Sequence, residues 1–140
     1  MAQFSHSIDI ARPPEDVWRT ISRPEQWFEG YLETRSRSAE YPAPGTSDDH
    51  LFRTRMKEEV VARVTHSEAP NVLEEDQEGK TFSRHVSYRL DPSDGGTRLR
   101  VDDTVDFKGV GKLASPIATR DIKKRWAMSL QHLKSVAEAS

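Results

Sequence analysis

The sequence predicts an α+β fold in which a seven-stranded antiparallel sheet packs against one long C-terminal helix. Three observations predict it: segments of alternating apolar and polar residues fill most of the chain, turn signals separate them, and an amphipathic helix follows the last of them. A helix has to bury its apolar stripe, and the sheet is the surface that these segments offer. Because 140 residues is a typical size for one core, we expect a single domain over residues 1–140.

The first strand and two short helices come from the N-terminal part of the chain. Residues 4–10 alternate apolar and polar side chains, which predicts a half-buried strand. Two prolines and two acidic residues at 13–16 favour the first turn of a helix, because proline loses no hydrogen bond there and acids complement the helix dipole. Pro24 begins a second short helical segment, which carries Trp27 and Phe28.

Six further segments show the pattern of strands and complete the sheet. They span about 30–38, 49–57, 58–67, 71–78, 80–91 and 96–108. Prolines, glycines, asparagine and aspartates mark the turns between them. Consecutive strands joined by short turns favour an antiparallel sheet.

The last helix is predicted over Ser115–Ser140. Ser115 and Pro116 form a start signal, because a serine oxygen can cap free amides and proline is tolerated at the first helical position. At about 1.5 Å per residue the helix could span more than about 30 Å. Its apolar stripe consists of Ala118, Ile122, Trp126, Ser129, Leu130, Leu133, Val136 and Ala137. On other faces, Arg120, Lys123, Lys124 and Arg125 form a basic patch, which we expect to be a solvated helix face rather than a contact for an acidic partner or a membrane.

Two charged residues lie on the apolar faces of the last two predicted strands. A hairpin centred near Ser93 and Asp94 would place Arg84 opposite Asp103. Buried charges are tolerated chiefly when they are paired, so we expect a salt bridge between them. The alternative is that they orient a carbonyl, carboxylate or phenol during cyclase-type chemistry.

Composition narrows the possible partners. The net charge of −2 and pI near 6.2 provide no general attraction for phosphate backbones, so we expect no nucleic-acid partner. Cysteine is absent and the five histidines lack metal-ligand spacing, so we expect neither a metal nor another cofactor. No apolar run approaches the roughly 18 residues of a membrane span, and Met1–Ser7 is too polar for a signal peptide. We therefore expect a cytoplasmic protein without a membrane span.

Two sequence segments and the last helix carry a family resemblance. I-x-I-A-R-P-P-E-D-V-W at residues 8–18, R-P-E-Q-W at 23–27 and the helix with Trp126 resemble the START-like, or SRPBCC, helix-grip superfamily. The resemblance is strongest to its polyketide cyclase/dehydrase and lipid-transport-like branch, and it covers the whole chain. It implies a seven-stranded antiparallel sheet curved around a long C-terminal helix, with two short helices between strands 1 and 2. It also implies a cavity for an apolar ligand.

The resemblance and the predicted faces together indicate a ligand-binding cavity. The expected lining residues are Phe52, Thr54, Met56, Val64, Arg84, Tyr88, Asp103 and Trp126. The alternative is that these are ordinary core residues that close a solid interior. A low hydrophobic content of 34% is compatible with a partly hollow interior, although the charged fraction of 31% alone could produce it.

The resemblance leaves three functions open, because one fold hosts many activities. The first is binding or transport of a hydrophobic small molecule, lipid-like or polycyclic aromatic. The second is a polyketide aromatase/cyclase-type enzyme in which Arg84, Asp103, Tyr88 or a histidine transfers protons. The third is a protein-interaction module similar to chaperone activators. A monomer and a homodimer paired through an edge strand both remain open.

Overall fold

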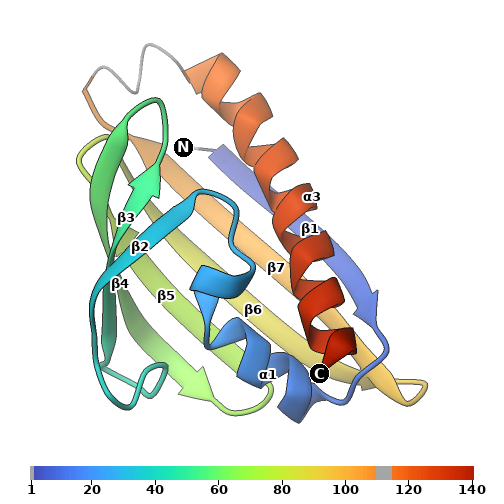
Figure 1. Cartoon of the computed structure of the whole chain (residues 1–140). Helices are drawn as coiled ribbons and strands as arrows, with labels where there is room; N and C mark the ends of the chain where they lie inside the picture. Colours follow the sequence, from blue (N-terminus) through green and yellow to red (C-terminus); the bar gives the residue numbers. More distant parts are fainter. Residues whose placement is uncertain (1, 110–114) are drawn as a thin grey trace.

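The computed structural model describes residues 2–109 and 115–140, except for the side chains of residues 115, 116 and 118. The strands are β1 (Ala2–Ile10), β2 (Tyr31–Arg37), β3 (Ser47–Arg53), β4 (Lys57–Glu68), β5 (Val72–Glu78), β6 (Phe82–Ser93) and β7 (Gly96–Phe107). The helices are α1 (Pro14–Ile21), the 3-10 turn η1 (Pro24–Gln26) and α3 (Ser115–Ala139). Figure 1 shows their arrangement.

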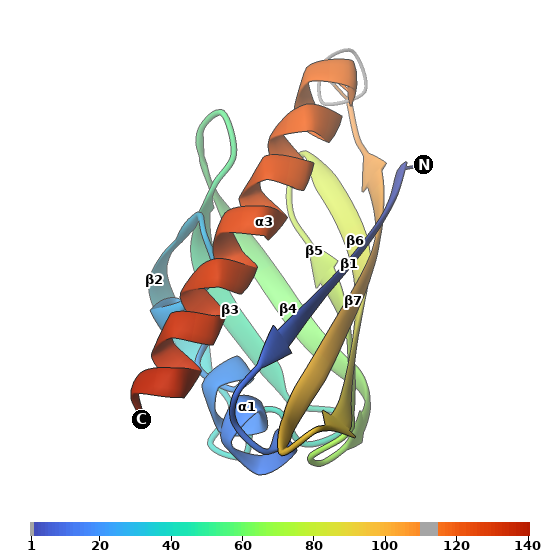
Figure 2. The same cartoon turned by 90° about the vertical axis from the view of Figure 1, so that its right-hand side faces the viewer.

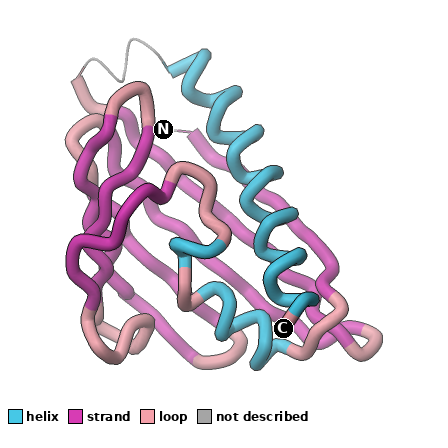
Figure 3. Tube along the Cα trace, in the orientation of Figure 1, coloured by secondary structure: helices cyan, strands magenta, loops and turns pink. Residues whose placement is uncertain are grey.

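All seven strands form one antiparallel sheet in the order β1-β7-β6-β5-β4-β3-β2. The sheet bends around α3, as the two views at right angles show (Figures 1 and 2). Figure 3 shows that the helices lie on the same side of the sheet. The predicted α+β helix-grip arrangement, with two short helices between β1 and β2, is therefore confirmed.

The hairpin between β6 and β7 corrects the predicted register. Its two-residue turn consists of Asp94 and Gly95, both with positive φ (46° and 80°), the backbone that a tight hairpin favours. The turn centre therefore lies one residue later than predicted, and Arg84 pairs with Val105 rather than with Asp103. Because this moves the pairing by two residues, every side chain keeps its face. Arg84 and Asp103 remain diagonal neighbours on the inner side.

Helix α3 buries the face that its sequence predicts. Trp126, Ser129, Leu130, Leu133 and Ala137 are buried, and Ile122 and Val136 are half-buried, whereas Ala118 lies outside the described side chains. The same interior contains apolar residues from β4, β6 and β7. Within the described residues, no helix is both long enough and apolar enough to cross a bilayer.

Candidate functional site

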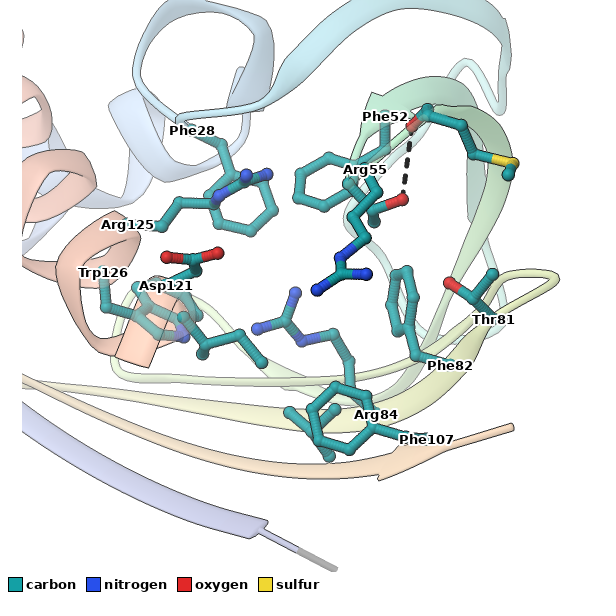
Figure 4. Close-up of a pocket in the computed structure, with 14 residues that line it drawn as sticks. Phe28, Phe52, Arg55, Thr81, Phe82, Arg84, Phe107, Asp121, Arg125 and Trp126 are labelled. Carbon is teal, nitrogen blue, oxygen red and sulfur yellow. Dashed lines mark hydrogen bonds between the residues drawn. The ribbon is translucent and has the colours of Figure 1, made fainter. Parts of the chain in front are cut away.

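A pocket of about 210 Å³ lies between α3, the inner face of the sheet and the turn that joins β3 to β4. Figure 4 shows the residues that surround it. Its lining consists of Phe28, Phe52, Thr54, Arg55, Met56, Thr81, Phe82, Arg84, Val105, Phe107, Asp121, Ile122, Arg125 and Trp126. These residues come from several strands and turns and from one helix, so the folded chain is needed to assemble them.

Buried aromatic rings form the inner wall of the pocket. Phe28 packs against Phe52 with ring centroids 5.5 Å apart and against Trp126 at 5.3 Å. Two hydrogen bonds position the segment that carries Phe28: its amide donates to the Pro24 carbonyl at 2.8 Å, and the next amide donates to Ser129 Oγ at 2.9 Å. The buried Ser129 of α3 thus helps to hold the segment that carries Phe28.

Asp103 holds two of the lining residues from behind. Arg84 Nε donates to its Oδ1 at 3.1 Å, Arg84 Nη2 donates to its Oδ2, and Trp126 Nε1 donates to Oδ2 at 2.8 Å. The side chains of the ion pair are 5% and 0% exposed. The predicted salt bridge is therefore confirmed, and the same carboxylate also orients the indole.

The guanidinium of Arg84 is surrounded by aromatic rings. Its Cζ lies 6.0 Å from the ring centroid of Phe28, 5.7 Å from that of Phe82 and 5.8 Å from that of Trp126, distances at which cation–π attraction operates. Asp103 accepts from Nε and Nη2, and no other described residue accepts from this guanidinium. Donors on Nη1 therefore remain available on the pocket side (Figure 4).

Arg125 supplies a second cation from α3. Its Cζ lies 5.1 Å from the Phe52 ring centroid, and its Nη1 donates to the Arg53 carbonyl. A side chain at Gly30 would collide with Nη1 and with the Phe52 ring, and Gly30 has φ +97°. Glycine at this position therefore gives the Arg125 guanidinium its space. Burial, with the nearby charges of Arg53 and Arg84, lowers the pKa of Arg125.

Exposed residues form the mouth of the pocket. Arg55 and Met56 belong to the turn after β3, Asp121 belongs to α3, and Met56 is 54% exposed. In Figure 4 the Arg55 guanidinium points toward that of Arg84, and the Asp121 carboxylate points into the same space. The mouth thus combines an apolar side chain with charges of both signs.

A buried carboxylate fixes the polar side of the pocket. Glu58 accepts hydrogen bonds from the hydroxyls of Thr54 at 2.8 Å and Thr81 at 2.6 Å, and from the Thr81 amide at 3.0 Å. Burial raises the pKa of Glu58, but the bonds from Thr81 and Thr54 outweigh burial and bring the pKa below its usual value. Glu58 therefore joins the turn after β3 to the start of β6.

Five of the eight residues expected from the sequence line the pocket: Phe52, Thr54, Met56, Arg84 and Trp126. The other three do not. Asp103 lies behind Arg84, Val64 is buried in the apolar core, and Tyr88 lies at a separate, smaller cavity. Thr54 and Met56 lie in a turn rather than in the predicted strand, because the Thr54 amide donates to the Met56 carbonyl at 2.9 Å and ends the pairing.

Nine of the fourteen lining residues were not expected from the sequence, Phe28 and Arg125 among them. The sequence pattern places Phe28 in a short helical segment and Arg125 on a solvated helix face, but Arg125 is half-buried at the pocket. The spacing carried a signal, because Arg125 lies three residues after the inward-facing Ile122 and therefore beside it on the helix. The assignment of Arg125 to a solvated face was wrong.

A second set of polar residues lies on the far side of Phe28, around a cavity of about 10 Å³. We call it the polar cluster: Tyr41, Asp48, His50, Glu75 and Tyr88. The Tyr41 hydroxyl donates to Glu75, and the His50 ring stacks on Tyr31 with centroids 4.2 Å apart. His50 Nδ1 lies 3.2 Å from Asp48 Oδ2, whereas Nε2 has no hydrogen-bond partner among the described residues. Phe28 is among the residues that line both cavities.

The histidines do not assemble a metal site in the described part of the chain, where no group of three or more potential ligands was found. His6 is half-buried and His50 is buried. His85 bonds to Asp76 at 2.6 Å and to Glu74 at 3.0 Å on strand residues that are largely exposed. Burial lowers the pKa of His85, but these two bonds outweigh burial and raise the pKa above its usual value.

A curved antiparallel sheet that holds a C-terminal helix over an aromatic pocket defines a helix-grip protein. The sequence agrees with this class. A sequence model of the family described as polyketide cyclase/dehydrase and lipid transport matches residues 1–138. The chain belongs to this family.

Solved structures from several sources share the fold. TTHA0849 from Thermus thermophilus is 17% identical, with a TM-score of 0.77 over 99% of this chain and 98% of the other. CV1439 from Chromobacterium violaceum is 14% identical (TM-score 0.75, 99% of both chains), and Ara h 8.0201 is 13% identical (TM-score 0.74, 99% of both chains). No curated protein matches the sequence. At these identities the likeness establishes the fold.

Proposed function

We propose that the protein binds a hydrophobic small molecule in the pocket between α3 and the sheet. The observation that carries the proposal is the aromatic wall of Phe28, Phe52, Phe82 and Trp126, which stands beside a few convergent polar groups. Ligand sites are typically apolar concavities with few, well-placed polar groups. An exposed mouth at Met56 gives such a ligand a route to the wall.

The pocket volume limits the size of the ligand. A cavity of roughly 150 Å³ holds a benzene molecule, whereas drug-sized ligands occupy about 300–1,000 Å³. At about 210 Å³ the pocket favours one or two rings, or an acyl chain of medium length, over a larger polycyclic molecule. The volume therefore narrows the range of lipid-like or polycyclic ligands expected from the sequence to small ones.

Native mass spectrometry of the protein purified from its own host tests the proposal. We expect a co-purified small molecule that is released by organic extraction. An Ile122→Trp variant should lose it, because Ile122 lines the pocket and the larger side chain fills the space. A Met128→Trp variant is the control, since Met128 lies on the same helix, is 41% exposed and is not part of the lining. Equal retention by both folded variants would contradict the proposal.

A cyclase or dehydrase activity is a second candidate, supported by the polar cluster. His50 and Glu75 are groups that can transfer protons, and Phe28 lines both their cavity and the pocket. A carrier returns its ligand chemically unchanged. An enzyme of this kind converts a keto-containing substrate, and a His50→Gln variant that still binds the substrate should lose the conversion.

A further inference from the structure

We infer that the pocket selects an organic anion: a carboxylic acid with a small aromatic or acyl body, its carboxylate held between Arg84 and Arg125. The inference rests on the proposed function, because it names the chemistry of the ligand of that same pocket. It also assigns Arg55, at the mouth, to the anionic end of the ligand.

The fixed charges of the pocket favour an anion. Three guanidinium groups, those of Arg55, Arg84 and Arg125, line it together with one carboxylate, that of Asp121. A second carboxylate, Asp103, lies behind Arg84 and is bound to it. A third carboxylate, Glu58, also lies outside the lining and accepts hydrogen bonds from Thr54 and Thr81. Among the lining residues themselves, the cations outnumber the anions. Neither Arg55 nor Arg125 forms an ion pair with any residue that the structure describes.

The three guanidinium groups point toward one space. Figure 4 shows Arg55 and Arg84 directed at each other across the pocket, with Arg125 reaching in from α3. Like charges brought together in this way repel one another, and the repulsion is larger where water is excluded. The lowered pKa of Arg125, due first to burial and then to Arg53 and Arg84, is consistent with an unneutralised cation. An anion placed among these groups would relieve both costs.

The fold holds these cations in position although burying a charge costs free energy, and packing alone would not require a charged side chain there. Asp103 fixes Arg84 through two bonds and leaves Nη1 free to donate into the pocket. Arg125 lies against the Phe52 ring, where glycine at position 30 leaves room for it. A leucine at position 125 could cover Phe52 without burying a charge, and the bond to the Arg53 carbonyl uses only one of the several donors of the guanidinium. The arginine therefore indicates a partner from outside the chain.

A carboxylate fits this arrangement better than other anions. Guanidinium groups present planar forks that match the two oxygens of a carboxylate. The aromatic wall of Phe28, Phe52 and Trp126 suits an apolar ligand body better than a polar one such as a sugar phosphate. A free inorganic anion would leave this wall without contact, so the ligand has to carry both parts.

Isothermal titration calorimetry with matched probes tests the inference. The probes are 2-naphthoate with 2-naphthamide, and decanoate with decanamide, each pair differing in the charge of one end. We expect at least one carboxylate to bind roughly tenfold more tightly than its amide, because charge-assisted hydrogen bonds are about twice as strong as neutral ones. Raising the salt concentration should lower the affinity for the carboxylate more than the affinity for the amide.

Arginine variants connect the selectivity to the residues. Arg125→Gln should lower carboxylate affinity about tenfold while amide affinity changes by less than about twofold. Arg125→Lys keeps the charge without the fork and should recover part of the loss. Arg120→Gln is the control, because it removes the same charge from an exposed position of the same helix outside the lining. Its carboxylate affinity should equal that of the wild type.

The outcomes separate this inference from the proposed function. If amides bind as tightly as carboxylates, or if Arg120→Gln matches Arg125→Gln, the selection of an anion is wrong while the hydrophobic pocket stands. If none of the four probes binds and no molecule co-purifies, the proposed function fails, and this inference fails with it.

Discussion

Two half-buried arginines, Arg37 and Arg125, differ in whether carboxylates of the protein pair with their guanidinium groups. Each lies over an aromatic ring, Arg37 at 5.5 Å from Tyr41 and Arg125 at 5.1 Å from Phe52. Arg37 donates to Asp48 at 2.8 Å and to Glu25 at 2.8 Å. Arg125 donates to a backbone carbonyl and has no carboxylate partner among the described residues.

The pKa values follow this difference. Burial lowers the pKa of Arg37, but the hydrogen bonds to Glu25 and Asp48 outweigh burial and raise it above its usual value. Burial lowers the pKa of Arg125, and nearby arginines lower it further. An arginine that is paired with carboxylates of the protein stabilises the fold. An arginine at a pocket without such a carboxylate partner indicates a ligand.

The largest expected effect comes from the one pocket cation that the protein does neutralise. Asp103→Ala leaves the Arg84 charge buried and Trp126 Nε1 without its acceptor. We expect a loss of about 3–5 kcal/mol in the free energy of unfolding, measured with denaturant. Asp102→Ala is the control, because Asp102 bonds to Arg100 near the surface, where an ion pair contributes about 0–1 kcal/mol. Similar losses in the two variants would show that Asp103 carries no buried pair.

The next prediction compares the two arginines directly. Arg37→Gln should cost about 1.5–3 kcal/mol, because it removes charged hydrogen bonds to Asp48 and Glu25. Arg125→Gln should cost less than about 1 kcal/mol, since a bond to a carbonyl and the contact with the Phe52 ring are lost but no ion pair is. Denaturant unfolding without ligand measures both. If Arg125→Gln proves the more destabilising, Arg125 is a structural residue and the comparison fails.

The Arg37 network also predicts an acid dependence. Burial raises the pKa of Glu25 and of Asp48, but hydrogen bonds, those from Arg37 among them, outweigh burial and bring both pKa values below their usual range. A lowered pKa contributes stability above the unfolded-state value, and this stability is lost as the pH falls through the folded-state value. The stability difference between wild type and Arg37→Gln should therefore shrink on acidification. A difference that stays constant down to the acid transition would contradict this.

Gly30→Ala tests the space that Arg125 occupies. A non-glycine residue at φ +97° is strained by roughly 1–2 kcal/mol, and the new methyl would displace Arg125 and Phe52. We expect a loss of about that size in stability and a weakening of carboxylate binding. Gly45→Ala, with φ +81° and open space around it, is the control for strain alone. If both variants bind carboxylates equally, Gly30 does not position Arg125.

The smallest effect is expected at the polar cluster, from Glu75→Gln. Burial is the main cause that raises the pKa of Glu75, and the Asp48 charge adds to it, while the bond from Tyr41 opposes both. The folded state therefore keeps the proton to a higher pH than the unfolded state does. Wild-type stability should fall relative to Glu75→Gln as the pH rises above about 4.5. A relative stability that rises with pH would reverse the sign and contradict the account.

The fold could be predicted from the sequence because its signals are local. Alternation within residues 4–10 and the stripe of α3 each describe one segment, and the turn residues separate the strands. The shared face of Arg84 and Asp103 could be predicted for the same reason. Their register could not, because the hairpin is centred on Asp94 and Gly95, and a two-residue error leaves both faces unchanged.

The site was harder to predict from the sequence because its residues come together only in the folded chain. The orientation of Arg125 depends on Gly30 and Phe52, which are distant in sequence and leave a space that the helix pattern does not reveal. Phe28 faces the pocket because Ser129 of α3 binds the following amide. Tyr88 faces the interior, but it packs against Trp27 and Trp126 and lines the smaller cavity instead.

We propose that the space between α3 and the sheet receives a hydrophobic molecule. Nuclear magnetic resonance of the three tryptophan indole N–H groups during titration with 2-naphthoate tests it most directly. We expect a saturable shift of the Trp126 signal, because Trp126 lines the pocket, and no shift at Trp18, which lies outside the lining. A Trp126 signal that stays unchanged while naphthoate binds, or binding that moves only Trp18, would contradict the account.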